Sequence, residues 1–592
     1  MNLPSMVSKA KSRDNQTVFL GYNHNIVNGA NEFFDMKNMT GDFCPVMSPR
    51  ARRARLDIKL TKPQGLLAKG ALAWVDSGRF YYGNKEIGTM NEEYEGDRQL
   101  ISMGAYIVIF PDKYRYNTAN GEFRKLGHSW KASGDVQLQI CTIDAQSIEP
   151  DGDRLITVKP EEPKNGDWWI DESGENDVLR CYSEATEDWV AVATTYVKIT
   201  ADGIGAGFEK LDAVEINETI EECGIDKGSY PIWDKGDDYI VITAFIKGKK
   251  TITFNKENPL TVERKIPDLD YVVESENRLW GCRWDGDINE ICASAQGDAT
   301  NWSKFLGTSQ DSYRLTVGSD GVFTGAAVQQ GYVMFFKENV IHKIYGSKPS
   351  NYQITNVAGR GIMNGSSKSA VIVNETLYYL SKNGVCQYGG GTPSGIYAPF
   401  GRERYRDGVA GKSGDKYYIS MKDRNGRYNL FCFDETLNMW FREDDTEVKF
   451  FAEDKGNLYF INGKNELWVT DYENYDEEYA LIASKERPFE WFAETGDIGI
   501  QEPDCKIYSD IQIRLEMDAA ATVSIFTQYD SDGQWVEQER IKNRPKGSYT
   551  VSFCTPKVDH FKLRICGRGD VKIYSVSKWF EQSSEVRGNN GN

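Results

Sequence analysis

The chain has 592 residues, of which 40% are hydrophobic and 12% aromatic, so it can bury the cores of several domains and is not intrinsically disordered. Its net charge of −18 disfavours a protein that grips a nucleic-acid backbone, but it suits one that lines a passage for DNA without holding it. No apolar run is long enough to span a membrane, and the first residues lack the apolar core of a signal peptide, so we expect synthesis in the cytoplasm.

The first 66 residues predict a segment that docks on the following domain. They contain one basic cluster, "RARRAR" from Arg50 to Arg55, in an otherwise acidic chain. One interpretation is a solvated turn, and the other is a docking strip for an acidic neighbour, a subunit or nucleic acid. The interaction candidates are Arg50, Arg52, Arg53 and Arg55.

Short strands joined by Gly, Asn and Asp turns dominate the rest of the chain. Residues 67–131 are predicted to form the first blades of a β-propeller. Four later copies of the pattern begin near Thr324, Ser369, Gly408 and Val448, roughly 40 to 45 residues apart, which is the period of four-stranded blades. We place the remaining blades in residues 267–486, with a stack of unrelated sandwiches as the alternative.

Two regions depart from the blade pattern. Residues 132–266 are too long for one blade and predict an inserted β-domain. Residues 487–582 alternate strictly between apolar and polar, as in "FKLRIC" from Phe561 to Cys566, which predicts a C-terminal β-sandwich. Residues 583–592 are expected to be a polar tail. The predicted fold class is therefore all-β.

Catalytic and metal-binding motifs are scarce. The segment "GVAGKSGD" contains Gly411-Lys412-Ser413, but Arg406 stands where a phosphate-binding loop needs glycine. There are four histidines, and His342 and His560 fall in strand patterns that favour a structural role. The eleven cysteines show no paired spacing, which predicts free thiols rather than zinc ligands or disulfides. We therefore expect no enzyme activity, no catalytic residues, no metal and no cofactor.

Two segments resemble a known family. "NEFFDMKNMTGDFCPVMSPRARR" is similar to the opening of tail-nozzle proteins of short-tailed bacteriophages, also called stabilisation or tail-hub proteins, through Pro45, Ser48, Pro49 and Arg50. "EICASAQGDATNWSKF", Glu290 to Phe305, resembles a later strand of that family. The matching residues there are Ser294, Ala295, Gly297, Asp298, Asn301 and Trp302.

The resemblance implies a structural subunit of a virion tail. Six copies would form a ring below the portal and adaptor proteins, continue the DNA channel and anchor tail fibres or spikes. The expected partners are further copies of this chain, the portal and adaptor, fibre or spike proteins, and double-stranded DNA in transit without sequence-specific binding.

In such a blade, "EICASA" is expected to be an inner strand and Gly297-Asp298 the turn that leaves it. Trp302 and Phe305 are expected to pack between neighbouring blades. The structural blade motif is therefore Ser294, Gly297, Asp298, Trp302 and Phe305. The alternative function is a carbohydrate-binding or glycan-cleaving propeller, suggested by Trp168-Trp169 and by the abundant carboxylates.

Overall fold

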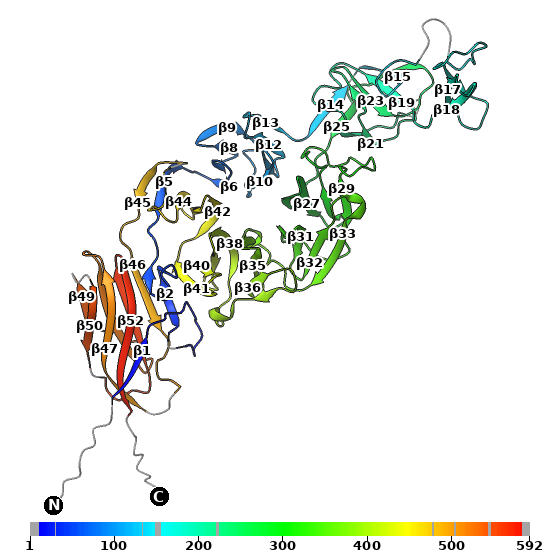
Figure 1. Ribbon diagram of the computed structural model, residues 1–592. Helices are drawn as coiled ribbons and strands as arrows, with labels where there is room; N and C mark the ends of the chain where they lie inside the picture. Colours follow the sequence, from blue (N-terminus) through cyan, green and yellow to red (C-terminus); the bar gives the residue numbers. More distant parts are fainter. Residues whose placement is uncertain are drawn as a thin grey trace, which may run out of the picture. The chain divides into compact units, whose positions relative to one another are not determined.

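The computed structural model describes residues 11–582 except 30, 133, 149–155, 221–223, 476, 478, 502–504, 543–545 and 554. The expected polar tail, 583–592, lies outside the described residues. The chain forms two compact units, one of Met1–Arg98, Gly321–Lys343 and Thr355–Asn592, the other of Gln99–Asp320 and Ile344–Ile354. It is an all-β protein, a β-propeller with an inserted β-domain and a C-terminal β-sandwich, which confirms the predicted fold class (Figure 1).

Seven sheets among the described residues have the up-and-down order of propeller blades. The second strand of each sheet is almost fully buried, as in "YVMFFK" of β31, which is typical of a strand covered on both faces. The blade strands are β6 (Pro63–Ala68), β7 (Leu72–Asp76), β8 (Arg79–Tyr82), β9 (Lys85–Thr89); β10 (Gln99–Met103), β11 (Tyr106–Phe110), β12 (Tyr114–Asn117), β13 (Phe123–Lys125); β26 (Tyr271–Ser275), β27 (Arg278–Trp284), β28 (Asn289–Ala293), β29 (Tyr313–Thr316); β30 (Gly325–Gln329), β31 (Tyr332–Lys337), β32 (Val340–Tyr345), β33 (Gln353–Ala358); β34 (Val371–Val373), β35 (Thr376–Ser381), β36 (Gly384–Tyr388), β37 (Ser394–Gly395); β38 (Arg406–Ser413), β39 (Lys416–Lys422), β40 (Tyr428–Asp434), β41 (Met439–Asp444); and β42 (Val448–Asp454), β43 (Asn457–Asn462), β44 (Glu466–Val469) with β5 (Ala54–Lys59) and β45 (Ile482–Lys485).

The last of these sheets is completed by the N-terminal segment. Strand β5 lies between β44 and β45 and pairs antiparallel with both, so a strand from near residue 55 closes a blade built from residues 448–485. In the same unit, the first strands of successive sheets contact one another: β34 contacts β38, β38 contacts β42, and β42 contacts β6. The first blade begins at Pro63, slightly before the expected residue 67.

The inserted domain consists of two sheets and a small three-stranded sheet, β16–β17–β18. Its core is rich in isoleucine and valine, because β15, for example, alternates buried Val136, Leu138 and Ile140 with more exposed residues. Its strands are β14 (His128–Ala132), β15 (Asp135–Cys141), β16 (Trp168–Asp171), β17 (Val178–Ser183), β18 (Asp188–Ala191), β19 (Tyr196–Thr200), β20 (Ala213–Ile216), β21 (Gly228–Pro231), β22 (Asp234–Lys235), β23 (Tyr239–Thr243), β24 (Lys249–Thr253) and β25 (Leu260–Arg264).

The C-terminal sandwich has the expected alternation, with Ile511, Ile513 and Leu515 buried on one strand and Phe561, Leu563 and Ile565 on another. Each of its two sheets also contains a strand of the N-terminal segment, β1 beside β52 and β2 beside β46. The strands are β1 (Ser12–Gln16), β2 (Phe33–Lys37), β46 (Glu490–Thr495), β47 (Lys506–Met517), β48 (Thr522–Tyr529), β49 (Val536–Lys542), β50 (Lys546–Ser552), β51 (Phe561–Arg568) and β52 (Val571–Gln582).

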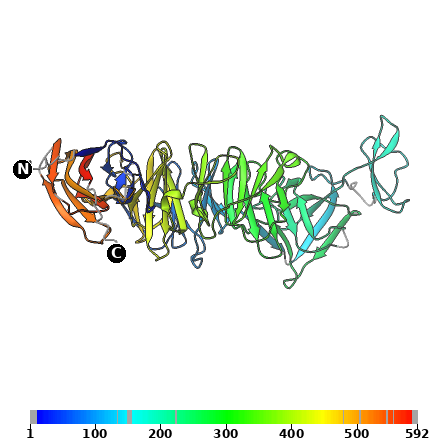
Figure 2. The same ribbon diagram turned by 90° about the horizontal axis from the view of Figure 1, so that it is seen from below.

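The N-terminal segment from Ser12 to Lys59 therefore joins the sandwich to the last blades, and we call it the strap. Between β2 and β5 it forms the short hairpin of β3 (Met39–Thr40) and β4 (Ser48–Pro49). Figure 2 shows this blue segment beside the orange and red strands of the sandwich. The sequence predicted that the segment docks on the propeller, but its pairing with both sheets of the sandwich was not foreseen.

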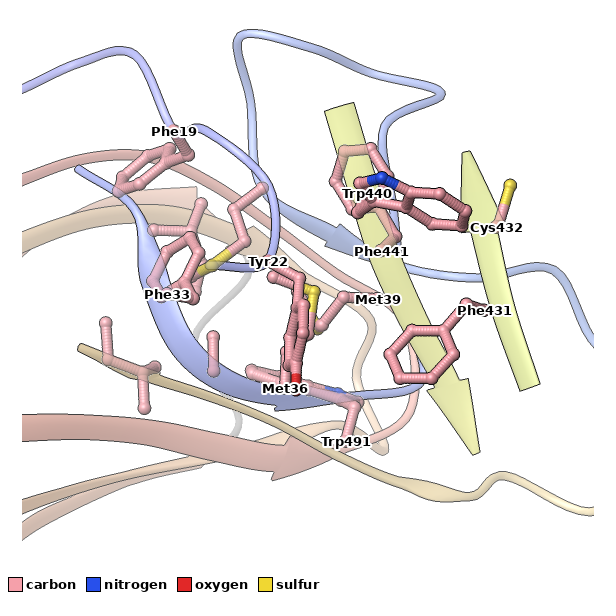
Figure 3. Packing of buried hydrophobic residues seen from close by; sticks show 14 of the residues in the cluster. Phe19, Tyr22, Phe33, Met36, Met39, Phe431, Cys432, Trp440, Phe441 and Trp491 are labelled. Carbon is pink, nitrogen blue, oxygen red and sulfur yellow. The ribbon is translucent and has the colours of Figure 1, made fainter. Parts of the chain in front are cut away.

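Apolar side chains of the strap fill the space between blade and sandwich. Phe33, Met36 and Met39 pack in one continuous cluster with Trp440 of β41 and Trp491 of β46 (Figure 3). Each such fully buried side chain contributes about 1.5–3 kcal/mol relative to exposure. The strap, the blade β38–β41 and the sandwich thus share one hydrophobic core.

The segment Glu290–Phe305 differs in part from its expected placement. Strand β28 is the third strand of its sheet rather than the inner one, because β26 begins the sheet and β28 lies between β27 and β29. Gly297 adopts a left-handed turn with φ of 78°. Trp302 is buried as expected, but Phe305 is 57% exposed and does not pack between blades.

Replacing Trp302 by alanine should lower the free energy of unfolding by about 3–5 kcal/mol, because Trp302 is buried in one hydrophobic cluster with Ile101, Val108 and Leu279 from two sheets. Phe305→Ala is the matched control and should change the free energy of unfolding by less than about 0.5 kcal/mol. Calorimetric and chemical unfolding of both variants would measure the difference. Equal effects of the two substitutions would contradict the placement.

Candidate functional site

A buried group of ion pairs lies where the strap crosses the last blades. Arg50 and Arg53 enter it from the strap, while Glu443 and Asp444 come from the end of β41 and Glu486 follows β45. The two arginines are only 5% and 4% exposed. We call these five residues the ion cluster.

Arg50 is fixed by several partners. Its guanidinium donates two hydrogen bonds to the carboxylate of Glu486, at 2.9 and 3.0 Å, and its Nε donates to Asn38 Oδ1 at 2.9 Å. The guanidinium also lies 4.2 Å from the centre of the Phe489 ring. A planar fork of this kind matches a carboxylate in a way that a lysine does not.

Arg53 binds the two neighbouring carboxylates of β41. Its Nη2 donates to Glu443 Oε2 at 2.5 Å and its Nη1 to Asp444 Oδ2 at 2.8 Å. Burial opposes ionisation of Asp444, but Arg53 and Arg50 outweigh it and lower the pKa of Asp444 to about 2. Arg53 also links to Glu486, whose Oε2 accepts its backbone N–H at 3.0 Å.

The structure corrects the interpretation of the basic cluster for two of its four residues. Arg50 and Arg53 are neither solvated nor available to an outside partner, because buried carboxylates of the same chain already bind them. Arg52 and Arg55 are half-buried at the surface, where Arg52 pairs with Glu473 at 3.0 Å and Arg55 donates to Ser484 Oγ at 3.4 Å. An interaction of these two with a partner stays a prediction.

An open groove lies next to the ion cluster in the same unit. It consists of two cavities of about 620 and 640 Å³ that share Asp42, Arg50, Ala51, Asp471 and Asn474. Acidic side chains outnumber basic ones in its lining. They are Asp42, Asp415, Asp434, Glu443, Asp471, Glu473, Glu516, Asp518 and Asp570.

Two carboxylates of the groove have opposite pKa shifts. Burial raises the pKa of Asp570, and the negative Asp518 and Glu473 add to the rise, although Arg52 opposes it. Hydrogen bonds from Tyr574 and Lys546 lower the pKa of Glu516. Asp570 and Glu516 thus line the same cavity with opposite tendencies to hold a proton, and acid–base catalysis uses carboxyls that differ in this way.

The second segment that resembles the phage family, Glu290–Phe305, lies in the other unit, where it connects a blade to the inserted domain. The Asn301 side chain donates to the carbonyl of Leu211 at 2.9 Å, and its Oδ1 accepts the N–H of Ala213 at 3.4 Å, so it links the blade β26–β29 to the inserted domain. Nearby, the carbonyl of Ser294 accepts a hydrogen bond from the buried Arg278 at 2.9 Å. These residues position domains, and a chemical role for them is not indicated.

Sequence reasoning missed the acidic half of the ion cluster. Glu443, Asp444 and Glu486 lie about 390 to 436 residues from their arginines, and a local pattern does not show such a pairing. The described residues contain no group of three or more His, Cys, Asp or Glu side chains arranged to hold a metal ion. They also include no helix that is long and apolar enough to cross a membrane.

No family model and no curated protein matches the chain. Solved structures with similar folds include the exo-β-1,3-galactanase of Phanerochaete chrysosporium, at 8% identity over 52% of this chain and 94% of that one, with a TM-score of 0.20. Kluyveromyces marxianus Hsv2 matches at 10% identity over 59% and 95%, with a TM-score of 0.24. A family 43 arabinoxylan arabinofuranohydrolase of Bacillus subtilis matches at 10% over 53% and 95%, with a TM-score of 0.16.

These comparisons correct the expectation that the chain is not an enzyme. Glycoside hydrolases are among the matched structures, whereas the expectation depended on missing sequence motifs. Glycoside hydrolysis needs two suitably placed carboxylates rather than a contiguous motif. The low identities and TM-scores assign neither a substrate nor a reaction to this chain.

The ion cluster predicts a specific loss of stability on substitution. Arg53→Met should lower the free energy of unfolding by about 3–5 kcal/mol, because Glu443 and Asp444 would remain buried with only their longer contacts to Arg50, at 4.0 and 3.5 Å. Arg52→Met is the control, and removal of its partly exposed ion pairs should cost at most about 1 kcal/mol. Urea unfolding at neutral pH measures both, and a similar effect of the two changes would contradict the role of the cluster.

The same cluster predicts acid sensitivity. Since the pKa of Asp444 is lowered from 3.8 to about 2, its ionised form stabilises the fold above pH 4 and this contribution, about 2 kcal/mol, is lost as the pH falls towards 2. Arg53→Met should therefore show a shallower loss of stability between pH 5 and pH 2 than the unmodified chain. Parallel curves for the two proteins would be the contrary result.

Proposed function

We propose that the chain is a structural subunit of a bacteriophage tail, one copy of a ring that continues the DNA channel and holds fibres or spikes. One observation carries the proposal: the residues that resemble tail-nozzle proteins lie at the joints between domains. If the residues that resemble tail-nozzle proteins fix the arrangement of neighbouring domains, the chain is suited to a structural role that needs rigid domains.

The first joint is formed by the strap. Ser48, Pro49 and Arg50 belong to the matched segment, and Arg50 is bound on one side to Asn38 and on the other to Glu486. Residues on either side of the matched segment pair with the sandwich through β1 and with a blade through β5. The matched residues therefore support the connection between sandwich and blade.

The second joint connects the inserted domain to its neighbouring blades. Asn301 bonds to the loop before β20, and Trp302 is buried between two sheets. Arg264, at the end of the inserted domain, donates to the Leu126 carbonyl at 3.1 Å and pairs with the buried Asp212 at 2.5 Å. Several bonds over a short stretch oppose hinge motion at this point.

Ring formation and passage of DNA are compatible with the remaining properties. A closed ring uses two different surfaces on each copy, which a chain with several domains can provide. A net charge of −18 repels a duplex and so disfavours arrest of DNA inside a channel.

Imaging of the protein tests this proposal. Alone or mixed with portal and adaptor proteins of a tailed phage, it should form rings of about six times the 67.0 kDa of one chain, visible by electron microscopy and mass photometry. Particles that remain single chains under both conditions would contradict the proposal.

A second candidate function, binding or cleavage of glycans, is favoured by the groove. In it, Asp570 would donate a proton to the leaving oxygen and Glu516 would act as base or nucleophile, as paired carboxylates do in glycosidases. The pair Trp168-Trp169, which suggested sugar binding, offers less: both rings are partly buried, and Trp169 packs edge-on against Trp189 at 5.6 Å.

This candidate predicts turnover of aryl glycosides that depends on Asp570. Asp570→Asn should abolish turnover, whereas Glu122→Gln, a change at an exposed ion pair with Arg124 in the other unit, should retain it. Since a raised pKa keeps Asp570 protonated to higher pH, activity should fall as the pH rises through that pKa. Absence of turnover and of binding across a glycan array would exclude this second candidate.

A further inference from the structure

At one end of the sandwich, where strands begin and finish, side chains that the proposed functions do not use lie close together. Asp497 follows the end of β46, Ser531 follows the end of β48, and His560 directly precedes β51. Strand β51 lies between β46 and β48 and is antiparallel to both, so these three positions meet at the same end of the sheet, where the strands begin or finish.

The side chains at this end of the sheet are in hydrogen-bond contact. Ser531 Oγ lies 3.0 Å from His560 Nε2, and His560 Nδ1 lies 2.9 Å from Asp559 Oδ2. The order hydroxyl, imidazole, carboxylate and both distances match the geometry by which a serine is activated as a nucleophile. From this arrangement we propose that Ser531, His560 and Asp559 form a site for acyl transfer, with a small activated ester as substrate.

The surrounding turn holds this geometry. Asp530 Oδ1 accepts the backbone N–H groups of Asp559 and His560 at 2.9 and 3.2 Å, which ties the serine turn to the histidine segment. Asp530 and Ser531 both have left-handed backbones, with φ of 46° and 53°. Residues other than glycine, asparagine and aspartate seldom adopt this backbone conformation. Strained residues of this kind concentrate at functional sites.

The three side chains of the site differ in exposure. Ser531 is exposed, the His560 side chain is 15% exposed, and the Asp559 side chain is 50% exposed, while the neighbouring Asp497 is 12% exposed. A substrate can therefore reach Ser531 Oγ, while the imidazole of His560 stays largely buried next to it. Asp497 also lines a cavity of about 280 Å³ together with Ile498, Tyr508 and Phe580, whereas Ser531 and His560 lie outside its lining.

The hydroxyl proton has two acceptors within reach, because Asp497 Oδ1 lies 2.9 Å from Ser531 Oγ and 3.6 Å from His560 Nε2, on the same side as the imidazole. When the hydroxyl proton points to His560 Nε2, the imidazole takes it as Oγ attacks the ester carbonyl. The carbon–oxygen bond to the alcohol then breaks, and His560 returns the proton to the leaving alkoxide. Water, activated by the same imidazole, next hydrolyses the acyl-Ser531 ester and restores the enzyme.

The full-length protein tests this directly with a fluorophosphonate probe, whose phosphorus is attacked by an activated serine with loss of fluoride. We expect mass spectrometry to find the label on Ser531 and p-nitrophenyl acetate to be hydrolysed. His560→Gln should reduce both by about 100-fold, the contribution of a general base. Ser552→Ala, which removes an exposed serine of β50, is the control and should change neither.

Two results would overturn the proposal. One is labelling of Ser531 no faster than that of Ser552. The other is labelling of Ser531 that His560→Gln leaves unchanged. Either would show that Ser531 and His560 only fasten the loops of the sandwich. Thermal unfolding of His560→Gln, compared with the unmodified chain, separates loss of chemistry from loss of the fold. Ring formation is independent of these outcomes.

Discussion

The buried contact of Arg50 and Arg53 with Glu443, Asp444 and Glu486 is the constraint on which one unit of the molecule depends. Buried charges are costly unless they are paired with good geometry. Two guanidinium groups on the strap therefore permit one position of β41 and of the segment after β45 relative to the strap. The apolar cluster around Trp440 and Trp491 adds most of the free energy, while the ion pairs select the arrangement.

Local patterns predicted the fold well where a strand pairs with its neighbour in sequence. The spacing of the later repeats indicated blades, and the alternation around Ile511 and Phe561 indicated the sandwich. The contributions of β1, β2 and β5 were not predictable, since these strands pair with partners more than 400 residues away. Pattern alone also does not distinguish an inner strand from the third strand of a blade, which explains the error at β28.

The candidate sites show the same limit. A run of arginines indicated a charged surface, because the sequence does not show where compensating carboxylates will lie. His560 was assigned a structural role from its position beside a strand. The chain fold brings Ser531 to it from 29 residues away. A site formed by residues at the ends of several strands depends on the order of the strands in the sheet, which one sequence does not reveal. The two joints, the acidic groove and this end of the sandwich are thus products of long-range pairing.

Rigidity of the connection between blade and sandwich is the claim on which the structural function rests. Pulsed dipolar spectroscopy would measure it, with spin labels carried by non-natural amino acids at the exposed positions Asn425, beyond β39, and Glu539, on β49. One narrow distance distribution is expected for the unmodified chain at neutral pH. A broad or bimodal distribution would mean that the strap does not fix the sandwich against the blades, and it would contradict a structural function based on rigid domain geometry.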